Sequence, residues 1–136
     1  MNISTKYSSK LVASLMLLTS IAASNQAAAS LVELKWDEHG RFQHKAEIKT
    51  GSILEVCGQL VAGQKIDWQF NSTKALDFNI HFHEGKKVNL PVKQKARKES
   101  AGQFEVIRDQ DYCWMWSNKT KNNAIIDLSL SPVPSK

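Results

Sequence analysis

The sequence predicts an all-β fold, a single antiparallel β-sandwich of the jelly-roll type. Short segments in which apolar and polar residues alternate recur along the chain, as in half-buried antiparallel strands. These segments are rich in aromatic and β-branched residues and are separated by Gly, Asn and Ser. No segment shows a helical period. A spacing of roughly ten residues predicts about seven to nine short strands in a sandwich.

The first half of the chain supplies four of these strands. In the clearest example, Ile66, Trp68 and Phe70 face one way and polar residues stand between them. Turn signals at Gly40 and Gly63 separate neighbouring strands. The expected strands are residues 31–36, 42–49, 52–60 and 65–70.

In the second half, Asn71-Ser-Thr is expected to break the chain before the alternation resumes. A short strand follows at 88–92, where Pro91 predicts an edge position, and residues 93–101 are expected to form a charged connection. The expected strands are 76–83, 88–92, 104–107, 109–118 and 124–130. In strand 76–83, the predicted inner face is Leu76, Phe78, Ile80 and Phe82, and the outer face is Asp77, Asn79, His81 and His83.

Strand 109–118 is the most aromatic segment of the chain. Alternation places Tyr112, Trp114 and Trp116 on one face and Cys113 and Met115 on the other. The three aromatic residues are therefore either all in the core or all exposed, and exposed they would mark a binding surface.

The N-terminal residues 1–29 read as a signal peptide. Lys6 and Lys10 precede the apolar run 11–23, and Ala27–Ala29 offers small residues for cleavage near Ala29. The run of 13 residues is shorter than the roughly 20 that span a bilayer, which disfavours the alternative of a retained anchor. The expected location is periplasmic or secreted, with no membrane span in the mature chain.

Removing residues 1–29 leaves 107 residues, one domain over residues 30–136. Its net charge is +3, from 16 Lys and Arg against 13 Asp and Glu. This excess is too small to indicate a nucleic-acid partner.

Two cysteines in an exported chain predict one disulfide, Cys57–Cys113. The bond would stabilise the fold by roughly 4 kcal/mol in the chain-entropy model. The alternative is a thiolate ligand or nucleophile, but no CxxC motif or flanking histidine supports it.

The order of these features resembles the GOLD (Golgi dynamics) domain, the β-sandwich of lumenal cargo receptors and of some lipid-transfer proteins. The match covers residues 50–131: Cys57, the Trp68–Phe70 strand, residues 76–82, Gly102-x-Phe104, Tyr112-x-Trp114-x-Trp116-x-Asn118 and an aliphatic last strand. The resemblance implies a β-sandwich with a non-catalytic binding role.

Two departures from this family limit what the resemblance implies. Cargo receptors have a cysteine three positions before the Asn, where this chain has Met115, although Cys113 lies on the same strand face. The sequence also shows no coiled coil or sorting tail after the domain. Cargo transport is therefore not implied.

His81 and His83 stand two residues apart, so both imidazoles are expected on one face. With Met115 as a third ligand they would form a soft site suited to Cu(I), and Asp77 or Glu84 are other candidates for the third ligand. The alternative is two surface histidines without a metal, since the mature chain has a single Met.

Six basic residues fall between residues 86 and 98. They would form a rim for an anionic partner, such as lipopolysaccharide headgroups or an acidic protein. The alternative is a solvated hairpin whose lysines prevent edge pairing. The six are Lys86, Lys87, Lys93, Lys95, Arg97 and Lys98.

No catalytic motif supports an enzyme. The chain has no Gly-x-Ser-x-Gly, no HExxH and no phosphate-binding glycine loop, and Asp109 and Asp111 read as turn residues. The expected function is an exported module without a cofactor that binds a protein or small ligand in the cell envelope. The alternatives are a periplasmic copper-binding protein and, third, a small hydrolase whose site the sequence does not reveal.

Overall fold

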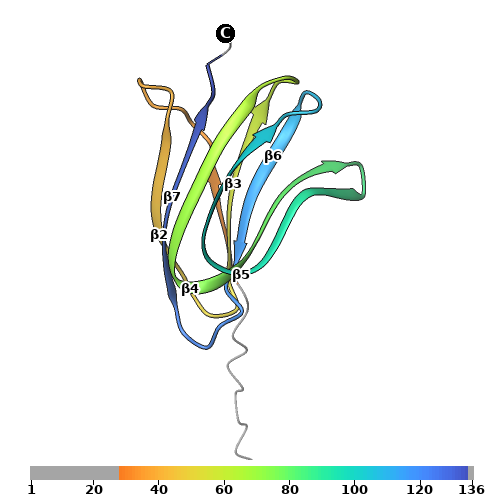
Figure 1. Cartoon of the computed structure of the whole chain (residues 1–136). Coiled ribbons are helices and arrows are strands. Elements are labelled where there is room, and N and C mark those ends of the chain that lie inside the picture. The colour runs from red at the N-terminus through yellow and green to blue at the C-terminus, as the bar shows by residue number, and fades with distance from the viewer. Residues whose placement is uncertain (1–27, 135–136) are drawn as a thin grey trace, which may run out of the picture.

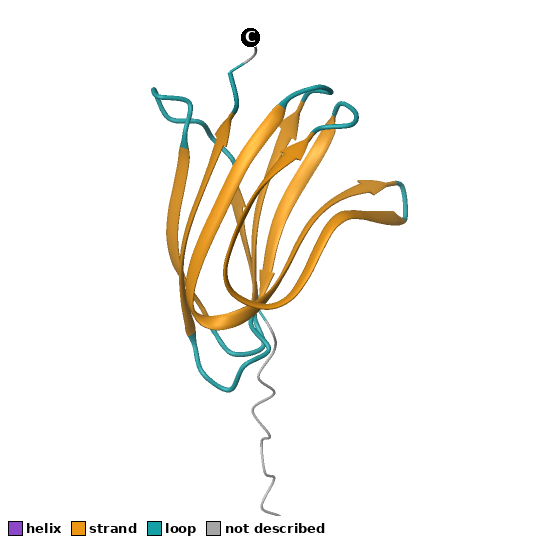
Figure 2. Ribbon diagram, viewed as in Figure 1, coloured by secondary structure: helices purple, strands orange, loops and turns teal. Residues whose placement is uncertain are grey.

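The computed structural model describes residues 28–134, and in this part every regular element is a strand (Figures 1 and 2). This confirms the all-β prediction. The signal peptide predicted over residues 1–29 lies outside the described residues, except for residues 28 and 29. The strands are β1 (Ala29–Glu33), β2 (Phe42–Ile48), β3 (Ile53–Leu60), β4 (Lys65–Glu84), β5 (Lys87–Glu105), β6 (Gln110–Ser117) and β7 (Ala124–Pro132).

The long strand β4 belongs to both layers of the sandwich. Its first half, residues 66–72, pairs with β7, and its second half, residues 77–81, pairs with β6. The strand order β1-β3-β6-β4-β7-β2 therefore runs from one layer into the other through β4 (Figure 1). Strand β5 pairs with β4 along nearly its whole length. All pairings are antiparallel except that of β1 with β3, which is parallel.

Two predicted interruptions are wrong. Strand β4 continues through Asn71-Ser-Thr, and residues 93–101 belong to β5 rather than to a connection. Local turn preferences are overridden here because both segments find cross-strand partners. The polar residues mark a bend, since the β4–β5 register shifts between Asn71 and Leu76 and Ala96 has a φ of 50°. The edge position predicted for 88–92 is confirmed, because β5 pairs with β4 alone.

The aromatic face of β6 lies in the core. The exposed fraction is 0% for Tyr112 and Trp114 and 1% for Trp116. The Trp116 ring lies 5.3 Å from that of Phe78 and 5.7 Å from that of Phe70, so it contacts both halves of β4. Of the two alternatives left open by the sequence, the core position is therefore the correct one, and the candidate binding surface at these three residues is excluded because they fill the space between the two layers.

Gly102 is the glycine of the Gly102-x-Phe104 pattern on which the resemblance to the GOLD domain rests in part. In the structure, the packing of Trp68 requires a glycine at this position. It lies opposite Trp68, whose indole covers it. A Cβ at position 102 would lie 2.7 Å from Trp68 Cζ2, which is closer than van der Waals contact allows. Because Trp68 is only 6% exposed, the ring has little room to move, and glycine is the residue that fits.

The predicted disulfide is confirmed. Cys57 on β3 lies directly opposite Cys113 on β6, with a Cα–Cα distance of 4.1 Å. The bond lies on the outer face of this layer, since Val56 and Trp114 beside it point into the core. It joins two strands that are 56 residues apart in the sequence.

Replacing Ala96 with glycine should stabilise the protein by about 0.5–1 kcal/mol. The left-handed backbone conformation destabilises an alanine by roughly 1–2 kcal/mol, and glycine removes this strain. Glycine also loses more backbone entropy on folding, which offsets part of the stabilisation. Urea unfolding measures the difference. The control Ala101→Gly, at an exposed position of β5 without a positive φ, should destabilise the protein. The same effect from both substitutions would contradict a bend at Ala96.

Candidate functional site

The end of the β4–β5 hairpin projects from the sandwich. The last pair between β4 and β6 is His81 with Cys113, and beyond it β4 diverges from β6 (Figure 1). The hairpin continues without this neighbour through the turn at Gly85. We call residues 82–92 the arm. It extends to the right of the body in Figure 1.

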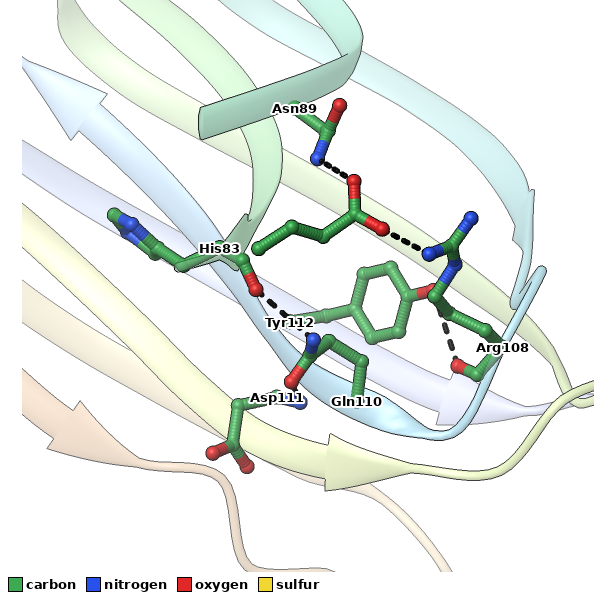
Figure 3. A network of polar contacts seen from close by, with 7 residues as sticks. His83, Asn89, Arg108, Gln110, Asp111 and Tyr112 are labelled. Atoms are coloured by element: carbon green, nitrogen blue, oxygen red, sulfur yellow. Dashed lines mark hydrogen bonds and ion pairs between the residues drawn. The ribbon is translucent and has the colours of Figure 1, made fainter. Parts of the chain in front are cut away.

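Side chains hold the arm where the strand pairing ends (Figure 3). Gln110 Nε2 donates a hydrogen bond of 2.9 Å to the carbonyl oxygen of His83. The guanidinium of Arg108 pairs with Glu84 and lies 5.6 Å from the centre of the Phe82 ring. These contacts replace part of the missing strand ladder. They indicate that the arm has a defined orientation.

Two further hydrogen bonds complete this network. Glu84 Oε2 accepts a 2.6 Å hydrogen bond from Asn89 Nδ2, which joins the two strands of the arm. The Tyr112 hydroxyl donates to the carbonyl oxygen of Arg108 at 3.2 Å. Because Tyr112 is fully buried, the network is anchored in the core.

The arm exposes apolar side chains. Val88 and Leu90 are each 45% exposed. Val88 lies opposite His83, so the two side chains share the outer face of the arm. Phe82 points the other way and is 3% exposed. The arm is therefore apolar on its outer face as well as on the face that packs against the core.

His81 and Asn79 are buried, although the sequence predicts them on a solvated face. They are 5% and 8% exposed. Both residues lie on β4 where it runs between β5 and β6, so neighbouring strands flank them on both sides. Next to His81 the pairing is irregular, because β5 places two residues, Leu90 and Pro91, against His81 alone. On its other side His81 lies beside Cys113.

His81 is held in one tautomer. Its Nδ1 lies 2.8 Å from Asn79 Oδ1, an oxygen that only accepts, so Nδ1–H donates and Nε2 keeps the lone pair. Burial lowers the pKa of His81 below its usual value of 6.5. The negative charge of Glu55 opposes this shift, and His83 adds to it.

The three predicted copper ligands do not converge on one point. The rings of His81 and His83 lie 5.3 Å apart, but Met115 pairs with Asn79, four residues before His83. Four residues of a strand span roughly 13 Å, so Met115 can approach His81 but not both histidines.

The other candidates for a third ligand are engaged. Asp77 binds Lys119 Nζ at 2.7 Å, and Glu84 binds Arg108 and Asn89. In residues 28–134, the one cluster of three His, Cys, Asp or Glu ligands is Glu55 with Cys57 and Cys113, whose sulfurs are bonded to each other. Copper binding stays a prediction, which here would rest on His81 and His83.

The six basic residues lie on and beside the arm. All are exposed, and within residues 28–134 none of them makes an ion pair. They are Lys86 in the turn and Lys87, Lys93, Lys95, Arg97 and Lys98 on β5. Because β5 is an edge strand, Lys93 to Lys98 also suit the alternative, protection against edge pairing.

Sequence reasoning missed the arm. The alternation of 76–83 gives no sign that β6 stops pairing at His81, since the inner face stays apolar through Phe82. The available signal was the sequence Val88-Asn-Leu90-Pro91, an apolar segment flanked by lysines directly after a turn. Asp109 lies in the bend before β6, as predicted, and its Oδ1 accepts a 2.8 Å hydrogen bond from the backbone N–H of Ala62. The same prediction is wrong for Asp111, which belongs to β6 and pairs with Gln59 of β3. No helix with the length and apolarity to cross a membrane occurs in residues 28–134.

The burial of His81 predicts a pH effect on stability. The unfolded chain takes up a proton near pH 6.5, whereas folded His81 resists it, so the free energy of unfolding should fall as the pH drops below 6.5. His81→Gln should remove this contribution. Urea unfolding of both proteins between pH 8 and pH 5 measures it. A pH profile that His81→Gln leaves unchanged would contradict the burial of His81.

No protein-family model and no curated protein matches this chain. Solved structures with the same fold do match. PliG of Aeromonas hydrophila, a periplasmic lysozyme inhibitor of g-type lysozyme, is 14% identical, with a TM-score of 0.61 over 79% of this chain and 100% of its own. Salmonella Typhimurium PliG, also a periplasmic inhibitor of g-type lysozyme, is 15% identical, with a TM-score of 0.56 over 76% and 98%.

A third match is the pre-peptidase C-terminal domain of a Bacillus anthracis collagenase. It is 12% identical, with a TM-score of 0.54 over 76% of this chain and 94% of its own. At these identities the likeness shows the fold, and it confirms the predicted sandwich class. None of the three structures is described as a GOLD domain, and membership of that family stays a prediction.

Proposed function

We propose that this protein is an exported, non-catalytic module that binds another protein of the cell envelope through its arm. The observation that carries the proposal is the exposure of Val88 and Leu90 on a hairpin that projects from the sandwich and is held by side chains.

The exposed apolar side chains are not explained by the stability of the fold. Full burial of a Val or Leu side chain contributes about 1.5–3 kcal/mol, and in the free protein Val88 and Leu90 obtain only part of it. Edge protection explains lysines and Pro91 on β5, but not apolar side chains on the same face. A partner that covers Val88 and Leu90 would recover this burial.

The network around Arg108 favours binding as well. A hairpin without neighbours would lose conformational entropy when a partner orders it. Gln110, Arg108 and Glu84 already hold the arm in the free protein, which lowers that cost.

The shape of the surface favours a protein over a small ligand. Small molecules bind in concave sites that enclose most of their surface. The arm projects, so it is suited to enter a concavity of a larger partner.

The fold and the chemistry of the chain support export and a binding role. The signal-peptide pattern of residues 1–29 and the Cys57–Cys113 bond suit an oxidising compartment. Two of the structures with this fold are periplasmic proteins that inhibit an enzyme. A g-type lysozyme is therefore the first candidate partner to test.

A photo-crosslinking amino acid at position 90 tests the proposal. We expect this residue, in the exported chain in living bacteria, to form a covalent adduct with another protein. The control places the same residue at Ile125, which is 37% exposed on β7. Strand β7 pairs with residues 66–72 of β4 and not with the arm. Position 125 should give no such adduct.

Purified protein allows a second measurement with a named partner. If g-type lysozyme is the partner, the protein should slow its lytic reaction, and Val88→Asp with Leu90→Asp should abolish the effect while Ile125→Asp does not.

The crosslinking experiment can contradict the proposal. No adduct at position 90, or equal adducts at positions 90 and 125, would exclude the arm as the binding surface.

A further inference from the structure

We infer that the partner presents an acidic protein surface to the arm. This inference rests on the proposed function, since it specifies the chemistry of the partner that the arm binds. It is carried by the basic residues on and beside the arm and by the contacts that engage Glu84 and Asp77.

All the charged residues in the segment from Lys86 to Lys98 are basic. Between Lys86 and Lys98 the chain has six basic residues and no Asp or Glu. All six are exposed. Such a concentration produces a local positive potential that a net charge of +5 for the whole chain does not suggest.

The neighbouring carboxylates do not neutralise this potential by direct ion pairs. Glu84 is engaged by Arg108 and Asn89. Asp77 accepts hydrogen bonds from Lys119 Nζ at 2.7 Å and from the Ala96 backbone N–H at 3.0 Å, with Lys95 at longer range. The six basic residues are thus left without ion pairs to carboxylates among residues 28–134.

Basic and apolar side chains share one face. Val88 lies opposite His83 and Lys93 lies opposite Asn79, and both His83 and Asn79 belong to the outer face of β4. Lys86 stands in the turn, and Lys87 begins β5 opposite Glu84. A partner that covers Val88 and Leu90 would therefore meet cations on both sides of the apolar contact, and carboxylates at those points would be complementary.

An anionic lipid surface would share this charge, but Leu90 is the one exposed side chain of the arm of the kind that enters a membrane interface. Surface-bound segments carry Trp, Phe or Leu over a broad apolar face. The aromatic residue of the arm is Phe82, which is 3% exposed and packs against Tyr112 in the core. The apolar contact surface is limited to Val88 and Leu90, which suits a protein.

Two probes separate these possibilities in vitro. Poly-L-glutamate represents an acidic polypeptide, and phosphatidylglycerol vesicles represent an anionic lipid surface. We expect the oxidised protein to bind poly-L-glutamate at low salt and to lose this binding at moderate salt, because exposed charges are screened. Isothermal titration calorimetry measures both.

Matched variants locate the binding surface. Lys86→Gln with Lys87→Gln and Lys93→Gln should weaken binding about tenfold, from three exposed charge contacts. The control, Lys45→Gln with Lys49→Gln and Lys121→Gln, removes the same charge from exposed positions outside the basic segment 86–98 and should change binding much less. Unfolding curves of both variants check that they fold.

Each other outcome overturns the inference. Equal losses in the two variants would show a response to net charge alone. Binding to vesicles but not to poly-L-glutamate would assign the arm to lipid, and no binding at low salt would remove the anionic partner. The crosslinking experiment separates this inference from the proposed function. If any of these results occurs and a protein adduct still forms at position 90, the arm binds a protein, but that protein does not present an acidic surface.

Discussion

The structure depends on one strand, β4, being continuous through a bend. Its first half carries Trp68 and Phe70 and its second half carries Phe78, and the Phe78 ring lies 4.7 Å from that of Trp68 and 5.2 Å from that of Phe70. The aromatic contacts between the two layers therefore begin within a single strand. Trp116 of β6 then contacts both Phe70 and Phe78. Because interiors are close-packed, these rings fix how the layers face each other.

The same strand produces the arm. After the bend, β4 pairs with β6 only as far as His81, while β5 follows β4 to its end. The hairpin must therefore leave the sandwich, and its last residues need other partners. Arg108, just before β6, and Gln110, the first residue of β6, supply them, and the buried Tyr112 of β6 holds the Arg108 backbone through its hydroxyl. The position of the candidate binding surface is in this way a consequence of the packing of the core.

Alternation and chemistry made much of the fold predictable. The period of two correctly places Leu76, Phe78, Ile80 and Phe82, and likewise Tyr112, Trp114 and Trp116, on core faces of their strands. The disulfide followed from the presence of two cysteines, Cys57 and Cys113, in a chain with a signal-peptide pattern. Long-range pairing was beyond such reasoning. Asn71-Ser-Thr has the composition of a turn, yet its partners β5 and β7 keep it extended. His81 is buried where β4 runs between β5 and β6, beside a two-residue irregularity in β5 that leaves no mark on the alternation. Sequence showed that Tyr112, Trp114 and Trp116 share a face, but not which side of the sheet is covered.

Nuclear magnetic resonance of the oxidised protein tests the central claim, the continuity of the β4–β5 hairpin, most directly. A continuous hairpin predicts backbone contacts between Asn71 and Glu99, between Asn79 and Lys93 and between His83 and Val88. It also predicts order parameters in the arm close to the value of about 0.85 for rigid backbone. Contacts that end at Asn71, with residues 93–101 and the arm as mobile as a loop, would contradict the bent strand, the held arm and the function proposed for it.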